Sequence, residues 1–145
     1  MGKKIKVENS LSMVMGKASR LLTNRISKNL SEHNVTAEQW MLLASLWRKN
    51  GQTQQALAEV SNKNKASITH LIDNLEKRQL VTRHADESDR RNKIIYLTPE
   101  GERLQEELAS IVKKTTKAMT RGIDKKDLKV SKQVMKQIIE NLLDD

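Results

Sequence analysis

A helical pattern that runs directly into two β-prone segments constrains the fold of this chain more than any other feature. Between Lys65 and Arg78, apolar side chains recur at the i, i+3, i+4 and i+7 spacing of one helix face: Ile68, Leu71, Ile72 and Leu75. Residues 80–83 and 93–97 contain the branched and apolar side chains that favour strands, and a charged tip separates them. The sequence therefore predicts a helix followed by a β-hairpin.

Helical patterns occupy most of the remaining chain. One apolar stripe begins at Asn9 or Ser10 and ends near Leu30, and a second helix begins at a capping box formed by Thr36 and Gln39. The other expected helices are a short one over 54–61, one that begins at Thr98 and Pro99 and breaks at Gly122, and one that begins near Asp124. We expect a mainly helical α+β fold, a winged helix-turn-helix with long helices at both ends.

The composition favours a polyanionic partner. The 145 residues include 27 Lys and Arg against 18 Asp and Glu, which gives a net charge of +9, so nucleic acid is the first candidate and an anionic membrane surface the second. Cysteine and phenylalanine are absent, and Trp40, Trp47 and Tyr96 are the only aromatic residues. Three aromatic side chains are too few to form a surface on which bases stack, so duplex DNA is favoured over single strands. No apolar run is long enough to span a bilayer, and we expect a cytoplasmic protein.

The polar face of the helix that begins at Lys65 is suited to a DNA major groove. Short polar side chains can reach base edges there, and an asparagine amide can pair with adenine through both of its groups. The candidate major-groove residues are Lys65, Ser67, Thr69, His70 and Asn74. Plain solvation of this face is the alternative. Asp73 is either a cytosine reader or a partner of Lys77 at i+4.

The predicted hairpin carries a cluster of cations that could lie along a minor groove or contact phosphates. These residues are Arg83, Arg90, Arg91 and Lys93, with Lys63 at the start of the preceding helix. Asp89 precedes the two adjacent arginines, and we expect it to orient an arginine rather than face DNA. The alternative is an ordinary solvated charge cluster.

The segments 71–78, 80–83, 89–91 and 97–101 together resemble the MarR family of bacterial transcription factors. The resemblance implies a single domain over 1–145, with a DNA-binding lobe at 36–98 and dimerisation helices at 1–35 and 99–145. It also implies a homodimer on a pseudo-palindromic site, with Arg90 as the minor-groove residue. Gln79 stands where the family usually has glycine, so it must adopt a backbone shape that glycine adopts easily. The tip at 85–88 lacks a proline often found in the family.

The terminal helices carry more apolar surface than a small winged domain can cover. A partner subunit would bury these stripes, although the helices could instead fold back on their own monomer. The residues expected at the dimer interface are Leu11, Val14, Ile111, Val134, Ile138 and Leu142. The resemblance also implies a small-molecule effector between the lobe and these helices. Trp40 and Trp47 are the places to look, although large rings on an apolar stripe are usually core anchors.

The sequence argues against an enzyme. The histidines His33, His70 and His84 have no metal-ligand spacing, and no phosphate loop or nucleophile elbow occurs, so no cofactor or metal is expected. The absence of cysteine excludes sensing by thiol oxidation. We expect a sequence-specific regulator of double-stranded DNA that acts as a repressor. An architectural DNA-binding protein and a winged helix that binds an acidic protein are the alternatives.

Overall fold

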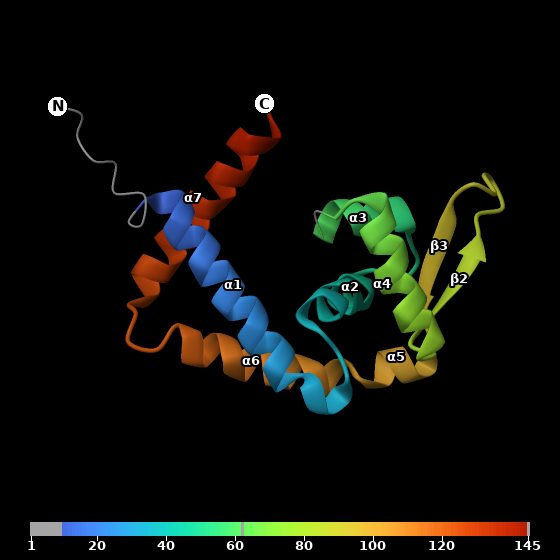
Figure 1. The fold of residues 1–145 in the computed structure, drawn as a ribbon, viewed down its shortest axis with the longest axis horizontal. Helices are drawn as coiled ribbons and strands as arrows, with labels where there is room; N and C mark the ends of the chain where they lie inside the picture. Colours follow the sequence, from blue (N-terminus) through green and yellow to red (C-terminus); the bar gives the residue numbers. More distant parts are fainter. Residues whose placement is uncertain (1–9, 62, 145) are drawn as a thin grey trace.

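The computed structural model describes residues 10–61 and 63–144, and its N-terminal part is helical (Figure 1). Helix α1 spans Leu11–Asn29, a single 3-10 turn (η2) spans Ser31–His33, and helix α2 spans Ala37–Arg48. The Ser10 hydroxyl caps α1 by accepting from the backbone N–H of Met13, whereas Asn9 lies outside the described residues. The predicted capping box is confirmed at the start of α2, where Thr36 and Gln39 each accept from the other's backbone N–H.

The winged lobe follows, and it contains one more strand than expected. Its elements are β1 (Gln52–Thr53), α3 (Gln54–Ser61), α4 (Lys65–Lys77), β2 (Val81–Ala85) and β3 (Lys93–Leu97). The antiparallel sheet has the order β1-β3-β2, with Arg83 opposite Ile95 in the hairpin. Strand β1 has two residues, too few to show an alternating pattern, and it forms by pairing with β3. The expected fold class is confirmed.

The C-terminal part consists of α5 (Pro99–Arg103), α6 (Gln105–Met119) and α7 (Lys125–Leu143). The Thr98 hydroxyl caps α5, as predicted. One continuous helix was expected from there, but Leu104 interrupts it and separates α5 from α6. Gly122 has a φ of 81° and separates α6 from α7, and the Asp124 carboxylate caps α7 by accepting from a backbone N–H. None of the helices in the described ranges is long and apolar enough to cross a membrane.

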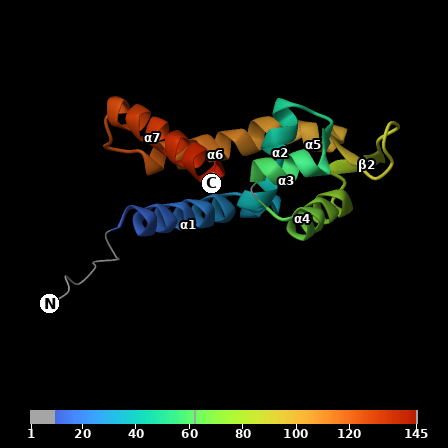
Figure 2. The ribbon, with the colours of Figure 1, turned by 90° about the horizontal axis from the view of Figure 1, so that it is seen from above.

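One hydrophobic core joins the lobe to α1 and α6. Its most deeply buried side chains are Leu30, Val35, Leu42, Leu43, Leu46, Leu57, Ile68, Ile72, Leu75, Val81, Ile95 and Leu108. The predicted apolar stripe of α4 is thus entirely inward, with all four of its residues buried. By contrast, α7 has no buried residue. The wing and α7 lie toward opposite ends of the molecule's longest axis. In the view from above, α7 lies on the side of the lobe away from the wing (Figures 1 and 2).

Two backbone positions determine how the wing leaves α4 and returns to α5. Gln79 has a φ of 60°, so the residue that replaces the family's usual glycine does adopt the left-handed conformation. Its carbonyl accepts a hydrogen bond from the Thr98 hydroxyl at 2.6 Å. Gly101 lies so close to the start of β2 that an added Cβ would stand 2.2 Å from the carbonyl oxygen of Leu80. The two ends of the hairpin are therefore held together by the Thr98 hydroxyl and by the close approach of Gly101 to Leu80.

Candidate nucleic-acid interface

Helix α4 presents its polar face to solvent because its apolar stripe is buried in the lobe. The Asn64 side chain caps the helix by accepting from the backbone N–H of Ser67 at 2.8 Å, which satisfies a donor at the helix start. Lys65, Ser67 and His70 are exposed, and Asn74 is half-buried. Ser67, His70 and Asn74 therefore occur together on one accessible face of α4, whereas Lys65 lies on another side of its first turn.

Thr69 differs from the other candidate major-groove residues. Its hydroxyl donates to the Lys65 carbonyl at 2.8 Å and accepts from the Gln54 side-chain amide at 2.5 Å. Thr69 is half-buried, and its hydroxyl bonds tie α4 to the first turn of α3. Its polar group is therefore already engaged within the lobe.

The wing tip exposes three cations. Arg90, Arg91 and Lys93 are all exposed, and the Arg91 side chain reaches 96% exposure. The Asp89 carboxylate accepts from the backbone N–H of Arg91 at 3.1 Å, and it stands 4.0 Å from the Arg91 Nε. The arginine that Asp89 contacts is therefore Arg91, and Arg90 has no ion-pair partner in the described residues.

Local hydrogen bonds shape the rest of the tip. The backbone N–H of Asp86 donates to the Asn92 carbonyl at 3.0 Å, which closes the loop between the strands. The Asp86 carboxylate accepts from the backbone N–H and the hydroxyl of Ser88, and these bonds, led by the backbone one, lower the pKa of Asp86 below its ordinary value. The tip thus has a defined turn without the proline.

Arg83 turns toward α4 rather than outward with the other wing cations. Its guanidinium contacts the Asp73 carboxylate at 2.7 Å and lies 3.7 Å from the Glu76 carboxylate, and its side chain is 21% exposed. The sequence left Asp73 between a cytosine reader and a partner of Lys77, and the structure provides a third partner. Periodicity could not indicate this pair, because it joins a helix to a strand.

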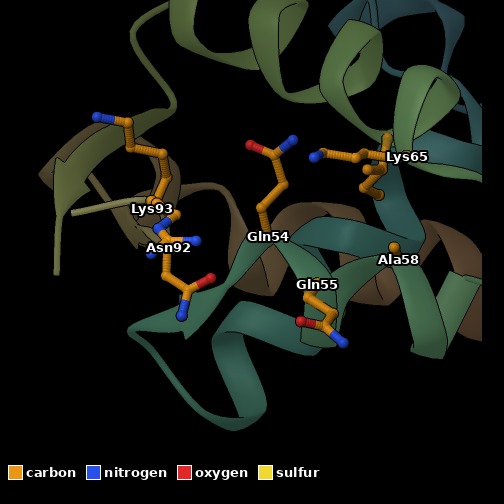
Figure 3. Close-up of a pocket in the computed structure, with 8 residues that line it drawn as sticks. Gln54, Gln55, Ala58, Lys65, Asn92 and Lys93 are labelled. Atoms are coloured by element: carbon orange, nitrogen blue, oxygen red, sulfur yellow. The ribbon is translucent and has the colours of Figure 1, made fainter. Parts of the chain in front are cut away.

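A hollow of about 380 Å³ separates α4 from the wing (Figure 3). Its lining residues are Gln54, Gln55, Ala58, Lys65, Ile68, Arg91, Asn92 and Lys93. The Gln54 side chain projects between Lys65 on one side and the start of β3 on the other. Lys65 and Lys93 have no carboxylate partner among the described residues, whereas Lys63 pairs with Glu38 at 2.8 Å. The hollow is therefore a cationic surface without an internal counter-charge.

Sequence reasoning missed the three amide residues of this hollow, Gln54, Gln55 and Asn92. The first two lie at the start of α3, which β1 and its pairing with β3 bring beside the wing. The available signal was their position in the first turn of the helix that precedes α4. The described residues contain no group of three or more histidine and carboxylate side chains placed to hold a metal ion.

The two tryptophans pack against the hydrophobic core, and both are half-buried. Trp47 donates its ring N–H to the Gly101 carbonyl at 2.9 Å, which links α2 to α5. The ring N–H of Trp40 is buried and has no acceptor in the described part of the chain. Trp47 thus stabilises the fold, and Trp40 retains an unused donor.

The residues expected at the dimer interface divide into two groups. Leu11 and Val14 of α1, and Val134 and Leu142 of α7, are between 45% and 70% exposed. Ile138 is half-buried, and Ile111 packs against the monomer's own core. Only Ile111 therefore belongs to the monomer's core, and the first group has its apolar surface in solvent.

Comparison with known proteins agrees with this architecture. Residues 35–93 match the model of the MarR family. The chain is 28% identical over 141 residues to the organic hydroperoxide resistance transcriptional regulator of Bacillus subtilis (strain 168), which covers 95% of this chain and 92% of that protein.

Two solved structures have the same fold. The MepR-DNA complex of S. aureus has a TM-score of 0.83 at 23% identity and covers 91% of this chain and 98% of that chain. CouR from Rhodococcus jostii RHA1, bound to p-coumaroyl-CoA, has a TM-score of 0.82 at 21% identity and covers 90% and 92%. Residues 35–93 therefore form a MarR-type domain, and the chain as a whole is similar to DNA-binding transcriptional regulators of that family.

Proposed function

We propose that this protein binds a pseudo-palindromic promoter site as a homodimer and represses transcription by covering it. One observation carries the proposal: the start of α4 and the start of β3 border the same cationic hollow. A duplex that receives α4 in its major groove therefore meets the wing on the same approach. We expect the two copies of α4 to lie about one DNA turn apart, roughly 10 to 10.5 base pairs.

The proposed contacts divide into base readout and backbone attraction. Ser67, His70 and Asn74 are suited to base edges, and Thr69 can offer its methyl group to thymine because its hydroxyl is engaged. The proposed backbone and minor-groove contacts come from Lys63, Lys65, Arg90, Arg91 and Lys93. Arg83 and Asp89 are better suited to holding the wing, because each already contacts groups of this chain.

The homodimer is supported by the exposed apolar residues of α1 and α7. Helix α7 has no buried residue, and its side chains Val134, Ile138 and Leu142 follow one another at i, i+4 and i+8 on a single face. Folding back on the monomer, the alternative considered from sequence, would have buried this stripe. A second copy of the chain would cover it by an isologous contact.

Regulation by a small molecule is a further part of the proposal. CouR is a structure bound to p-coumaroyl-CoA, and a comparable effector here would be accommodated near Trp40, whose buried ring N–H lacks an acceptor. A peroxide response through thiol oxidation is excluded because the sequence contains no cysteine. We place the protein in the cytoplasm and assign it no enzymatic activity or cofactor, in keeping with its relatives' description as transcriptional regulators.

Selection of bound sites from random duplex DNA, followed by footprinting of the upstream region of the protein's own gene, tests this function. The expected result is an inverted repeat protected on one face, with affinity that falls steeply as salt rises. A footprint indifferent to sequence would favour an architectural protein instead. Failure to bind duplex at all, with retention of acidic proteins, would favour a protein-binding winged helix.

A further inference from the structure

The C-terminal end of α4 is attached to the segment that connects α1 to α2. The Arg78 guanidinium donates one hydrogen bond to the carbonyl oxygen of His33 at 2.7 Å and another to the carbonyl oxygen of Asn34. Asn34 has a φ of 55° and donates its own N–H to the Ser31 carbonyl. A guanidinium with two carbonyl acceptors is a charge-assisted fork that fixes direction as well as distance.

The connecting segment is in turn attached to the long helices. The His33 Nε2 lies 3.6 Å from a Glu107 carboxylate oxygen of α6, and the Ser27 hydroxyl of α1 accepts from the backbone N–H of Ala37 at 2.9 Å. Nearby, the Asn29 side-chain amide donates to the hydroxyl of Thr115, a buried residue of α6, at 2.8 Å. The segment to which Arg78 is hydrogen-bonded is therefore attached to α1 and α6.

Arg78 lies at the end of α4, so its hydrogen bonds bear on the direction of that helix. It is the C-cap residue of α4, directly before the left-handed Gln79 at which the chain turns into the wing. Arg83 of β2, by contrast, contacts Asp73 and Glu76 of α4 and so acts within the lobe. Arg78 instead links the groove-reading helix to the helices proposed to form the dimer.

We propose that Arg78 is a positioning residue that sets the direction of α4 relative to the dimerisation helices, and thereby the half-site spacing that the dimer accepts. This inference rests on the proposed homodimer. One added base pair moves the second half-site by about 3.4 Å and rotates it by about 34° to 36° around the duplex. An α4 that can rotate at its C-terminal end could still reach a half-site displaced by one base pair, whereas an α4 fixed in direction could not.

The absence of cysteine makes a direct measurement possible. Ala66→Cys places one spin label on the exposed side of α4, and the label-to-label distance distribution is measured in the DNA-free dimer by pulsed dipolar spectroscopy. Arg78→Ala is expected to broaden that distribution about twofold. Arg78→Lys, whose ammonium lacks the fork, is expected to give an intermediate width and provides the test if the alanine variant fails to fold. Arg48→Ala is the matched control, because Arg48 is an exposed arginine at the end of α2 and its side chain has no hydrogen-bond or ion-pair partner among the described residues.

The second readout is the dependence of affinity on half-site spacing, measured without the label. The parent protein is expected to discriminate against one added or removed base pair by about tenfold or more, and Arg78→Ala to reduce this to about twofold. Unchanged widths and unchanged ratios in Arg78→Ala, or one common loss of affinity at every spacing, would overturn the inference. If the parent protein gives no measurable label-to-label distance between subunits, or binds all half-site spacings equally, the proposed homodimeric readout is refuted instead.

Discussion

At the scale of single residues, Gln79 shows how a local requirement of the fold is met by an unfavourable side chain. The chain must leave α4 through a left-handed residue so that the wing can begin, and the Gln79 carbonyl is held by the Thr98 hydroxyl. A residue with a Cβ has a steric penalty in this conformation that glycine does not have. The turn therefore forms at a cost that the surrounding contacts offset.

Gln79→Gly is expected to stabilise the protein. Relief of the left-handed strain, less the added entropy of a glycine in the unfolded chain, should raise the free energy of unfolding by up to about 1 kcal/mol. Denaturant unfolding of the two proteins measures the difference. Gln79→Ala is the control and should bring no gain, since alanine keeps the Cβ. Destabilisation by the glycine variant would argue that the glutamine side chain makes a contribution larger than the strain.

Asn74 and Arg90 are expected to contribute differently to DNA binding. Asn74→Ala should relax the preference at one base position by about 1 to 3 kcal/mol, because an amide pairs with a base edge. Arg90→Ala should weaken binding mainly to sites with A·T-rich flanks, whose narrow minor groove attracts arginine. Binding to a panel of single-base operator variants separates the two effects. Equal losses by both variants on all sequences would contradict this division.

At the scale of elements, the wing and α4 behave as one unit because Arg83 bridges them. The Asp73 and Glu76 carboxylates lie on the helix, Arg83 lies on β2, and the pair is partly shielded from water. Partial shielding strengthens a charge-assisted hydrogen bond relative to an exposed ion pair. A residue expected from sequence to contact DNA is thus suited to a different role, that of holding the hairpin against α4.

Arg83→Ala is expected to lower DNA affinity without lowering its salt dependence. If Arg83 holds the wing, the slope of log affinity against log salt stays unchanged, and the free energy of unfolding falls by about 1 kcal/mol. Lys93→Ala is the comparison, because loss of one direct phosphate contact reduces the slope by about 0.9. Titrations at several salt concentrations provide both slopes. A slope reduced by the same amount in Arg83→Ala would show that Arg83 contacts a phosphate directly.

At the scale of the whole molecule, the lobe has a complete core, and α7 has none of its own. The buried cluster includes residues of α1, α2, α3, α4, both hairpin strands and α6, yet no residue of α7 is buried. Exposed leucine and valine side chains on a helix of this length require a partner surface. The stability of α7 is therefore expected to depend on protein concentration, as it does when a fold is completed by a second subunit.

Ile138→Asp is expected to dissociate the proposed dimer while leaving the lobe folded. A carboxylate at the centre of the α7 stripe would be desolvated in a subunit interface, whereas Gln133→Asp on the opposite face of the helix should leave assembly unchanged. Analytical ultracentrifugation gives the mass of each variant, and circular dichroism reports whether the lobe remains folded. An Ile138→Asp protein that keeps the parent's assembled mass would place the interface elsewhere.

The sequence by itself determined the local structure and the electrostatic character of this protein. The apolar stripe of α4, the Thr36 and Thr98 caps, the break at Gly122 and the hairpin all follow from patterns within a few residues. Such features depend on neighbours at i+3 and i+4 or on strand alternation, and a single sequence displays both. The net charge of +9 likewise favours a polyanionic partner without any knowledge of the fold.

Only the tertiary structure decided which distant groups meet. It paired the two-residue strand β1 with β3, and it interrupted the helix at Leu104. It also placed Arg83 against Asp73 and Arg78 against the segment that connects α1 to α2. These partners are separated by up to 45 positions in the chain, and no local pattern encodes them. Their geometry depends on how the core packs, because a long charged side chain binds whichever complementary group the packed elements bring within reach.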